Sequence, residues 1–323
     1  MFKQRYLPLW ITTSLLMVLF LIGSMQFDGF ASSRVVMNLF SDNAFLMITA
    51  IGMTLVIISG GIDLSVGAVI ALSGVATSVL ITQYQWHPLA AFALILPAGT
   101  LFGALMGTII YSYRLQPFIV TLAGMFLARG LATTLSEQSL EIDHPFYDFV
   151  ADFGFELPGA AWLDLSTLIF ASVFLLAILL MHYSRLGNNI YALGGNEHSA
   201  QLMGVPVKRT TITIYAASSF LATLAGIVFT FYTFSGYALA AVGVELDAIA
   251  AVVIGGTLLT GGRGFVAGTI LGVLLMGVIQ TYISFDGSLS SWWTKIVIGL
   301  LLFFFIVLQK GLNGKPAKTI TSH

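Results

Sequence analysis

Residues 165–184 read LSTLIFASVFLLAILLMHYS, a run that contains no Asp, Glu, Lys or Arg. A stretch of about 20 apolar residues is long enough to cross the hydrocarbon core of a membrane as a helix. Similar stretches recur from Leu7 to about residue 309, and charged residues make up only 8% of the chain against 58% apolar ones. A soluble domain has about 25% charged residues. We therefore expect an all-α polytopic membrane protein whose residues 1–323 form a single transmembrane domain.

The apolar stretches predict ten transmembrane spans. They are placed at about residues 7–27, 43–60, 64–83, 88–112, 117–135, 165–184, 210–233, 247–261, 265–285 and 292–309. The eighth is short and could be a half-helix, whereas residues 29–42 are too polar to span and are expected to lie along the membrane interface. The first stretch could be a signal peptide, but its length and the poor cleavage site at residues 24–26 favour an uncleaved span.

The positive-inside rule orients these spans, because loops that carry Lys and Arg stay in the cytoplasm. With ten spans, the following residues fall on one side: Lys3, Arg5, Arg114, Arg185, Lys208, Arg209, Arg263, Lys310, Lys315 and Lys318. Only Arg34 and Lys295 fall near the other face, so both termini are expected in the cytoplasm. Residues 136–164 then form a periplasmic loop that holds half of the chain's 14 acids and no Lys or Arg. This loop is either a solvated surface or a docking surface for an external partner.

Several classes of function are excluded by what the sequence lacks. There is no cysteine, so disulfides, thiol catalysis and zinc–thiolate sites are impossible. Gly256 and Gly261 have the spacing of a phosphate loop, but Gly262 and Arg263 follow in place of Lys and Ser or Thr, so nucleotide binding by this chain is not expected. The sequence also has no basic patch of the kind that would indicate nucleic-acid binding. We expect no catalytic residue, metal or cofactor in this chain. An ion-coupled carrier, which needs acids within its spans, is the weaker alternative.

Two glycine-centred segments, residues 52–70 and 256–270, look alike. Each consists of a span, a glycine pair and a second span, which predicts a parallel internal repeat of the kind in which interrupted helices flank a transport path. Shared composition is the alternative explanation. The glycines that we expect to act as hinges or close-packing points are Gly60, Gly61, Gly255, Gly256, Gly261 and Gly262.

Residues 185–209 form a long cytoplasmic segment. A short helix is predicted over residues 197–203, after a flexible Gly194–Gly195 pair, with Ala200, Leu202 and Met203 as an apolar face. Such a helix suits docking into a groove on a soluble partner, although a plain connector is the alternative. The candidate docking residues are Arg185, Gly187, Tyr191, Gly194, Gly195, Asn196, Glu197, Ala200, Met203 and Gly204.

Residues 185–205 resemble the coupling loop of bacterial monosaccharide ABC-transporter permeases of the ribose type. Two further blocks support the resemblance, GGIDLSVG at residues 60–67 and ELDAIAAVVIGGT at residues 245–257, and the likeness runs from about residue 40 to 310. A narrower likeness lies in residues 142–148 and 281–295, which look like the galactofuranose-type permease, a system in which two different permease chains pair.

The resemblance implies half of an inner-membrane importer that performs no covalent chemistry. A periplasmic sugar-binding protein would deliver the sugar, and this chain would form the path with a second permease chain in the lipid bilayer. Cytoplasmic ATPase subunits, which bind the ATP, would dock on residues 185–209. A relative that imports another furanose-forming sugar, such as arabinose, is an alternative to galactofuranose.

Candidate residues for the path follow from the chemistry of a sugar. Its apolar C–H faces and many hydroxyls suit aromatic faces and neutral hydrogen-bonding groups. With the charged residues of the family blocks, the pathway candidates are Asn43, Asp63, Glu245, Asp247 and Gln280, and further candidates are Thr54, Ser59, Tyr232 and Tyr282. Packing is the alternative role for each, and for Asp63 it is capping of the span that follows.

Overall fold

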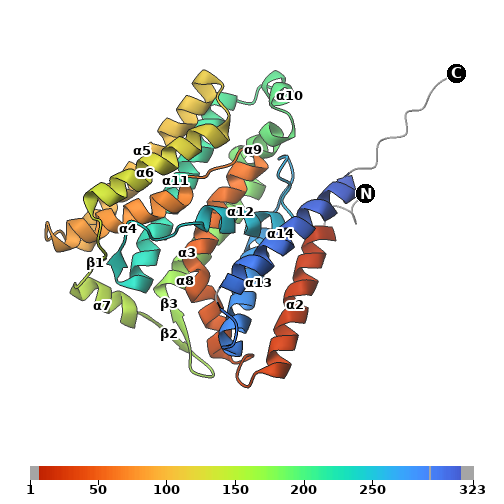
Figure 1. The fold of residues 1–323 in the computed structure, drawn as a ribbon. Coiled ribbons are helices and arrows are strands. Elements are labelled where there is room, and N and C mark those ends of the chain that lie inside the picture. Colours follow the sequence, from red (N-terminus) through yellow and green to blue (C-terminus); the bar gives the residue numbers. More distant parts are fainter. Residues whose placement is uncertain (1–6, 291, 314–323) are drawn as a thin grey trace.

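The computed structural model describes residues 7–290 and 292–313, which form a bundle of helices with a few short strands (Figure 1). The helices are α2 Leu7–Gln26, α3 Ser33–Ile58, α4 Val66–Thr82, α5 Pro88–Tyr113, α6 Pro117–Leu135, α7 Pro145–Asp152, α8 Leu165–Tyr183, α9 Arg185–Gly195, α10 Glu197–Leu202, α11 Val207–Thr233, α12 Val244–Ile254, α13 Val266–Asp286 and α14 Trp292–Asn313. The strands are β1 Leu140–Glu141, β2 Gly154–Leu157, β3 Ala161–Asp164 and β4 Ser235–Gly236.

The predicted all-α, multi-span architecture is confirmed. Within the described residues, eight helices are long and apolar enough to cross a membrane, namely α2, α3, α5, α6, α8, α11, α13 and α14. The predicted third span is the shorter apolar helix α4, of 17 residues. The predicted eighth span is α12, whose 11 residues extend about 16 Å, roughly half of the hydrocarbon thickness. The length of α12 therefore agrees with the half-helix alternative for this segment.

The prediction that residues 29–42 lie along the interface is wrong, because α3 begins at Ser33 and continues through this segment as one helix of 26 residues. Some of its polar side chains are partnered by the distant segment 136–164. Ser41 Oγ donates to Asp164 Oδ2 at 2.7 Å, and Arg34 Nε donates to the carbonyl oxygen of Ala160 at 3.5 Å. The polar residues of this segment, which in the sequence indicated an interfacial position, thus serve contacts with a distant part of the fold.

Helices α3 and α11 lie at the centre of the bundle. Residues 46–58 of α3 are all buried, and α11 packs against α3, α4 and α5. Two glycines let α5 approach α11 closely: a Cβ atom at Gly103 would lie 2.5 Å from Ser219 Cβ, and one at Gly107 would lie 2.9 Å from Ile212 Cα. Small residues allow this approach between helices in lipid, where the hydrophobic effect does not drive helices together.

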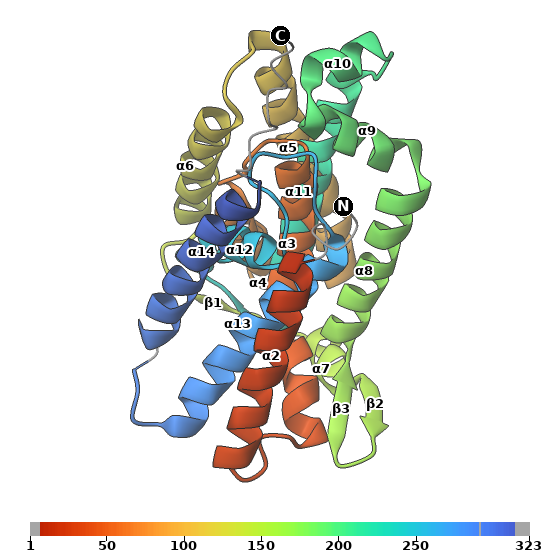
Figure 2. The ribbon, with the colours of Figure 1, turned by 90° about the vertical axis from the view of Figure 1, so that its right-hand side faces the viewer.

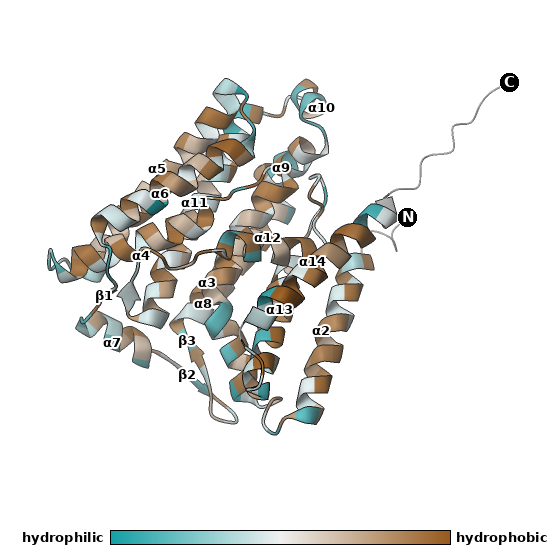
Figure 3. Ribbon diagram, viewed as in Figure 1, coloured by the Kyte–Doolittle hydropathy of each residue, from teal (hydrophilic) through white to brown (hydrophobic). Residues whose placement is uncertain are grey.

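The bundle has two distinct ends (Figures 1 and 2). Helices α9 and α10 lie at one end, and α7, β2 and β3 lie at the other. Hydrophobic residues run along the helices, and hydrophilic residues are most frequent at the ends (Figure 3). Basic residues gather at the end that carries α10. Arg114 lies 2.6 Å from Glu197 of α10, and Arg263 and Lys310 line a cavity with Gly194. This gathering agrees with the predicted sidedness, although Lys3, Arg5, Lys315 and Lys318 lie outside the described residues.

The acidic segment 136–164 is folded. Strand β2 pairs antiparallel with β3, and β1 pairs antiparallel with β4, with Leu140 opposite Gly236. Tyr147 of α7 is buried, and its hydroxyl lies 2.8 Å from Thr230 Oγ1 of α11. Burial raises the pKa of this phenol. The segment is therefore fixed to the bundle, so its acidic side chains are presented on an ordered surface.

The two look-alike segments share local structure. In each, a helix ends at a glycine turn, with φ of +88° at Gly60 and +92° at Gly256, and the next helix begins at a valine, Val66 or Val266. Positive φ is the conformation that glycine adopts without the steric cost that other residues meet. The helices before the turns differ, with 26 residues in α3 and 11 in α12.

Candidate functional site

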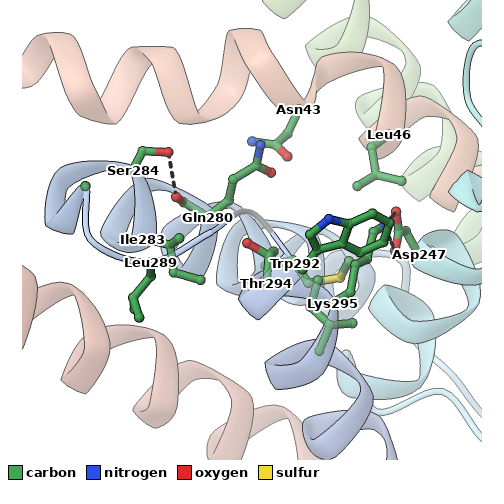
Figure 4. A pocket seen from close by; sticks show the side chains of 13 residues that line it. Asn43, Leu46, Asp247, Gln280, Ile283, Ser284, Leu289, Trp292, Thr294 and Lys295 are labelled. Atoms are coloured by element: carbon green, nitrogen blue, oxygen red, sulfur yellow. Dashed lines mark hydrogen bonds and ion pairs between the residues drawn. The ribbon is translucent and has the colours of Figure 1, made fainter.

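Two adjoining cavities, of about 700 and 380 Å³, form a polar cleft between helices. Both are lined by Asn43, Leu46, Asp247, Gln280 and Ser284. Asn43 comes from α3, Asp247 from α12 and Gln280 from α13, so the fold brings together three of the predicted pathway residues (Figure 4). The cleft continues to the α13–α14 turn and the beginning of α14.

The amide side chains of the polar cleft are positioned by backbone contacts. Asn43 Nδ2 donates to the carbonyl oxygen of Leu39 at 2.9 Å, and the amide packs on Gly277, where a Cβ atom would lie 2.8 Å from that nitrogen. The side chains of Asn43 and Gln280 point toward one another in Figure 4. The cleft thus offers neutral donors and acceptors close together, an arrangement that suits hydroxyl groups of a ligand.

An ion pair forms another part of the cleft wall. Lys295 Nζ of α14 donates to both carboxylate oxygens of Asp247, at 2.8 Å to Oδ1 and 2.6 Å to Oδ2. Asp247 lies in the first turn of α12, where the positive end of the helix dipole favours a carboxylate. The Lys295 side chain is 52% exposed and that of Asp247 is 17% exposed, so the pair is open to the cleft.

Our sequence prediction omitted several cleft residues, including Lys295, Trp292, Ser284 and Asp42. Asp42 and Tyr232 line the smaller cavity, and Trp292 lines the larger one. A signal for Lys295 was present, since it is one of two basic residues that the span assignment put near the outer face. The block 281–295, which carries the narrower family resemblance, also pointed to this region, because it contains Ser284, Trp292 and Lys295.

Other predicted pathway residues lie elsewhere. Thr54 is buried, and its hydroxyl lies 2.7 Å from Thr269 Oγ1. Tyr282 donates to Gln26 Oε1 at 2.6 Å, which joins α13 to α2. Ser59 lines a separate cavity of about 240 Å³ near the Arg114–Glu197 ion pair. Of the four further candidates, only Tyr232 faces the polar cleft.

Asp63 is fully buried between α3 and α4. Its Oδ1 accepts from Ser65 N at 3.0 Å and Ser65 Oγ at 2.6 Å, and its Oδ2 accepts from Ser218 Oγ of α11 at 2.8 Å. Burial raises the pKa of Asp63, although these hydrogen bonds oppose the rise. The geometry supports the capping interpretation in a modified form, because Ser65 is the N-cap of α4 and Asp63 holds that serine in place.

Glu245 lies in the first turn of α12 but does not line the polar cleft. Its Oε2 is buried without a hydrogen-bond partner among the described residues. This oxygen lies so close to Gly67 that a Cβ atom at position 67 would overlap it. Nearby, Arg129 Nη1 of α6 donates to the carbonyl oxygens of Ala238 and Ala240 at 2.6 and 2.7 Å. Arg129 therefore fixes the turn that leads into α12.

At the end of the bundle that carries α10, predicted hinge glycines meet predicted docking glycines. We call Gly60, Gly194, Gly195, Gly261 and Gly262 the glycine cluster. A Cβ atom at Gly194 would overlap the carbonyl oxygen of Ile58, and one at Gly261 would lie 2.9 Å from Gly60 Cα. Tyr191 of α9 also donates to the carbonyl oxygen of Gly264 at 2.9 Å. The segment 185–209 thus contacts both the turn at Gly60 and the loop of residues 261–264 before α13.

Two details of the docking segment differ from the prediction. Gly194 and Gly195 are not a flexible linker, because they form the last residues of α9, which Ser184 caps. The predicted apolar face is also wrong: Ala200 is buried, whereas Leu202 and Met203 are 77% and 72% exposed. A helix turns once in 3.6 residues, so positions 200 and 202 point in nearly opposite directions. Leu202 and Met203 alone form the exposed apolar tip.

The remaining hinge and docking candidates have local structural roles. Gly255 packs on α13, where a Cβ atom would lie 2.6 Å from Thr269 N, and Gly256 lies against Pro8 of α2. Gly61 lies against the Tyr215 hydroxyl, and Gly187 lies against the carbonyl oxygens of residues 180 and 181. Asn196 caps α10, since its Oδ1 accepts from Ser199 N at 2.7 Å.

A comparison with protein families finds a match over residues 35–306 to the family described as branched-chain amino acid transport system / permease component. The chain is 55% identical over 310 residues to "Inner membrane ABC transporter permease protein YjfF" of Escherichia coli (strain K12), which covers 96% of this chain and 94% of that protein.

Two further relatives carry sugar names. "Fructose import permease protein FruG" of Bifidobacterium longum (strain NCC 2705) is 38% identical, with 96% of this chain and 92% of that protein covered. "Ribose import permease protein RbsC" of Escherichia coli (strain K12) is 37% identical, with 91% of each chain covered.

Proposed function

Because the chain belongs to the family of branched-chain amino acid transport system / permease components, we propose that it is the permease subunit of an ABC importer for a monosaccharide. Relatives over nearly its whole length carry the names of ribose and fructose import permeases and of an inner membrane permease. The multi-pass fold suits the bacterial inner membrane. The chain is a transport subunit, and ATP hydrolysis belongs to a partner ATPase.

The observation that carries the choice of a sugar is the polar cleft. Asn43, Gln280 and Ser284 supply uncharged hydrogen-bonding groups, and Trp292 supplies an aromatic face. A site for a sugar needs this combination, because the ligand has apolar C–H faces and many hydroxyls. The cleft joins residues from α3, α12, α13 and α14, so relative movement of these helices would change its shape.

The family description favours an amino acid as the second candidate substrate. Such a ligand carries a carboxylate, which needs a free cation or several N–H donors. Among the described residues that line the cleft, Lys295 is the basic one and it is already paired with Asp247, while Asp42 adds another carboxylate. The charges of the cleft therefore favour a neutral sugar over an amino acid.

We propose a furanose, with galactofuranose as the leading candidate and arabinose as the alternative. The block 281–295, which resembles the galactofuranose-type permease, contributes much of the cleft wall. Its lining residues are Ser284, Gly287, Leu289, Trp292, Thr294 and Lys295. Residues that distinguish one sugar permease from another are expected where the sugar passes, and this block meets that expectation.

The opposite end of the bundle supplies a route for coupling. We propose that α9 and α10 dock on the ATPase through the exposed Leu202 and Met203, and that the glycine cluster transmits movement to α3 and to the loop before α13. Contacts between backbone atoms leave little room for side chains to absorb a displacement. A periplasmic binding protein would meet the folded segment 136–164, and a second permease chain would complete the path.

Uptake measurements test this function. Cells that contain the binding protein, the ATPase and the second permease should lose uptake of labelled galactofuranose, arabinose, ribose or galactose when this chain is deleted. Loss of uptake of a branched-chain amino acid, with every sugar unchanged, would overturn the sugar assignment. Uptake that persists without the ATPase would overturn the ABC mechanism in favour of an ion-coupled carrier.

A further inference from the structure

We infer that Asp247, Lys295 and Trp292 form a subsite that binds a neutral monosaccharide through two adjacent hydroxyls and one apolar face. The inference rests on the proposed function and adds to it the residues and the charge of the ligand. All three side chains line the larger cavity of the polar cleft, and they come from α12 and α14 (Figure 4).

The ion pair offers hydrogen bonds of both kinds side by side. Lys295 Nζ has three N–H donors and uses two on Asp247. Each carboxylate oxygen of Asp247 has a further lone pair after accepting one of those bonds. A ligand can thus meet a donor and an acceptor whose heavy atoms lie 2.6 to 2.8 Å apart. Adjacent ring hydroxyls of a sugar, each able to donate and accept, fit this pair of groups.

Trp292 supplies the apolar surface. Its side chain is 75% exposed, although it lines the cavity at the beginning of α14, three residues before Lys295. Residues three apart lie on the same face of a helix. The indole and the ammonium therefore belong to one face of α14, and a sugar that stacks on the indole can also reach the ion pair.

The charge of the cleft defines the class of ligand further. Among the described lining residues, Asp42 and Asp247 carry negative charge and Lys295 carries positive charge, which leaves one net negative charge. Since Asp247 already neutralises Lys295, the subsite offers no unpaired positive charge to the carboxylate of a sugar acid or to a phosphate group, and Asp42 in the adjoining smaller cavity adds only negative charge. The subsite is therefore selective for uncharged sugars.

The direct test uses the permease–ATPase complex, containing this chain and its partner permease, in lipid nanodiscs without the binding protein. Tryptophan fluorescence is titrated with galactose, arabinose and galacturonate in the millimolar range. We expect a saturable change with a neutral sugar and none with galacturonate. The change should disappear in Trp292→Phe and persist in Trp10→Phe, because Trp10 is an exposed residue of α2 outside the cleft. A neutral-sugar signal that survives in Trp292→Phe would overturn the inference.

A second measurement separates ligand binding from a structural role of the ion pair. In proteoliposomes with the complete importer, Lys295→Met should lower sugar uptake at least about tenfold while ATP hydrolysis continues, since a charged hydrogen-bond donor to the ligand is lost. The exchange Asp247→Lys with Lys295→Asp restores an ion pair but reverses donor and acceptor. We expect this exchange to change the order in which neutral epimers compete for uptake.

The outcomes distinguish the two proposals. If the wild-type importer transports no neutral sugar, the proposed function fails. If it transports sugar, but Lys295→Met has wild-type uptake or the charge exchange restores uptake with the original order of epimers, the pair is only structural and this inference alone fails.

Discussion

The amide nitrogen of Gly262 donates a hydrogen bond of 2.8 Å to the carbonyl oxygen of Ile58, which joins the loop before α13 to the last residue of α3. Gly194 of α9 lies at the same contact, since a Cβ atom there would overlap the Ile58 oxygen and lie 2.6 Å from Gly262 N. Three segments far apart in sequence therefore meet through their backbones. This contact predicts how the docking segment acts on the spans.

Replacing Gly194 by Leu should uncouple the two ends of the protein. The new side chain has no space, and overpacking of this kind costs about 1 to 3 kcal/mol. We expect reduced sugar uptake by the assembled importer while ATP hydrolysis continues, together with a lower melting temperature. Gly130→Leu is the matched control, because Gly130 is helical and a Cβ atom there meets nothing within 4 Å. Wild-type uptake in Gly194→Leu would contradict a role of the glycine cluster in coupling.

At Gly204, the effect of a substitution should depend on whether the new residue can adopt the backbone conformation, because there is space for a side chain. Its φ is +84°, and a Cβ atom there meets nothing within 4 Å. Left-handed backbone costs an ordinary residue about 1 to 2 kcal/mol, whereas Asn adopts it more readily. We expect Gly204→Asn to retain more coupled uptake than Gly204→Val at equal expression. Equal activity of the two variants would show that this turn is not a constraint on docking.

Asp63→Asn should preserve the fold better than Asp63→Ala. The amide oxygen can still accept from Ser65 N, and Ser218 Oγ can accept in place of donating. Alanine leaves the buried serine groups without an acceptor, at a cost of about 1 to 3 kcal/mol. Thermal unfolding of the detergent-solubilised protein measures both. If uptake and expression of Asp63→Asn match the wild type, a role of the Asp63 charge in transport is excluded.

The same residue predicts a dependence of stability on pH. Burial raises the pKa of Asp63 in the folded state, whereas the unfolded value is about 3.9. The folded state then binds the proton more tightly, so this contribution to stability is present below the unfolded pKa and is lost as pH rises through the folded pKa. Asp63→Asn should remove this part of the pH dependence, and an unchanged difference between acidic and neutral melting temperatures would contradict it.

Arg129→Met should destabilise the turn before α12. The variant leaves the carbonyl oxygens of Ala238 and Ala240 without their donor, and hydrogen bonds to charged groups contribute about 1.5 to 3 kcal/mol. We expect increased protease or hydrogen-exchange accessibility over residues 237–243 and lower uptake. Arg129→Lys keeps the charge with a different geometry and should be intermediate. Protection equal to the wild type in Arg129→Met would show that other contacts position α12.

Properties that depend on local sequence were predictable. The apolar stretches at 88–112, 117–135 and 165–184 became α5, α6 and α8 with small changes at their ends, because the length and hydrophobicity of a span are contained in the span itself. The glycine turns at Gly60 and Gly256 were also visible, since positive φ strongly favours that residue. The family blocks identified Asp247 as a pathway candidate, and side-chain chemistry identified Asn43 and Gln280.

Relationships between distant segments were decided only by the tertiary structure. The polar beginning of α3 was assigned to the interface because Asp164 and Ala160, its partners, lie more than 100 residues away. The ion pair with Asp247 places Lys295 in the cleft wall, and the contact with the Ile58 carbonyl oxygen leaves no space for a side chain at Gly194. A sequence determines which segments prefer lipid and where the backbone can turn. Which polar groups satisfy one another depends on the folded arrangement, because each such pair joins surfaces that only packing brings together.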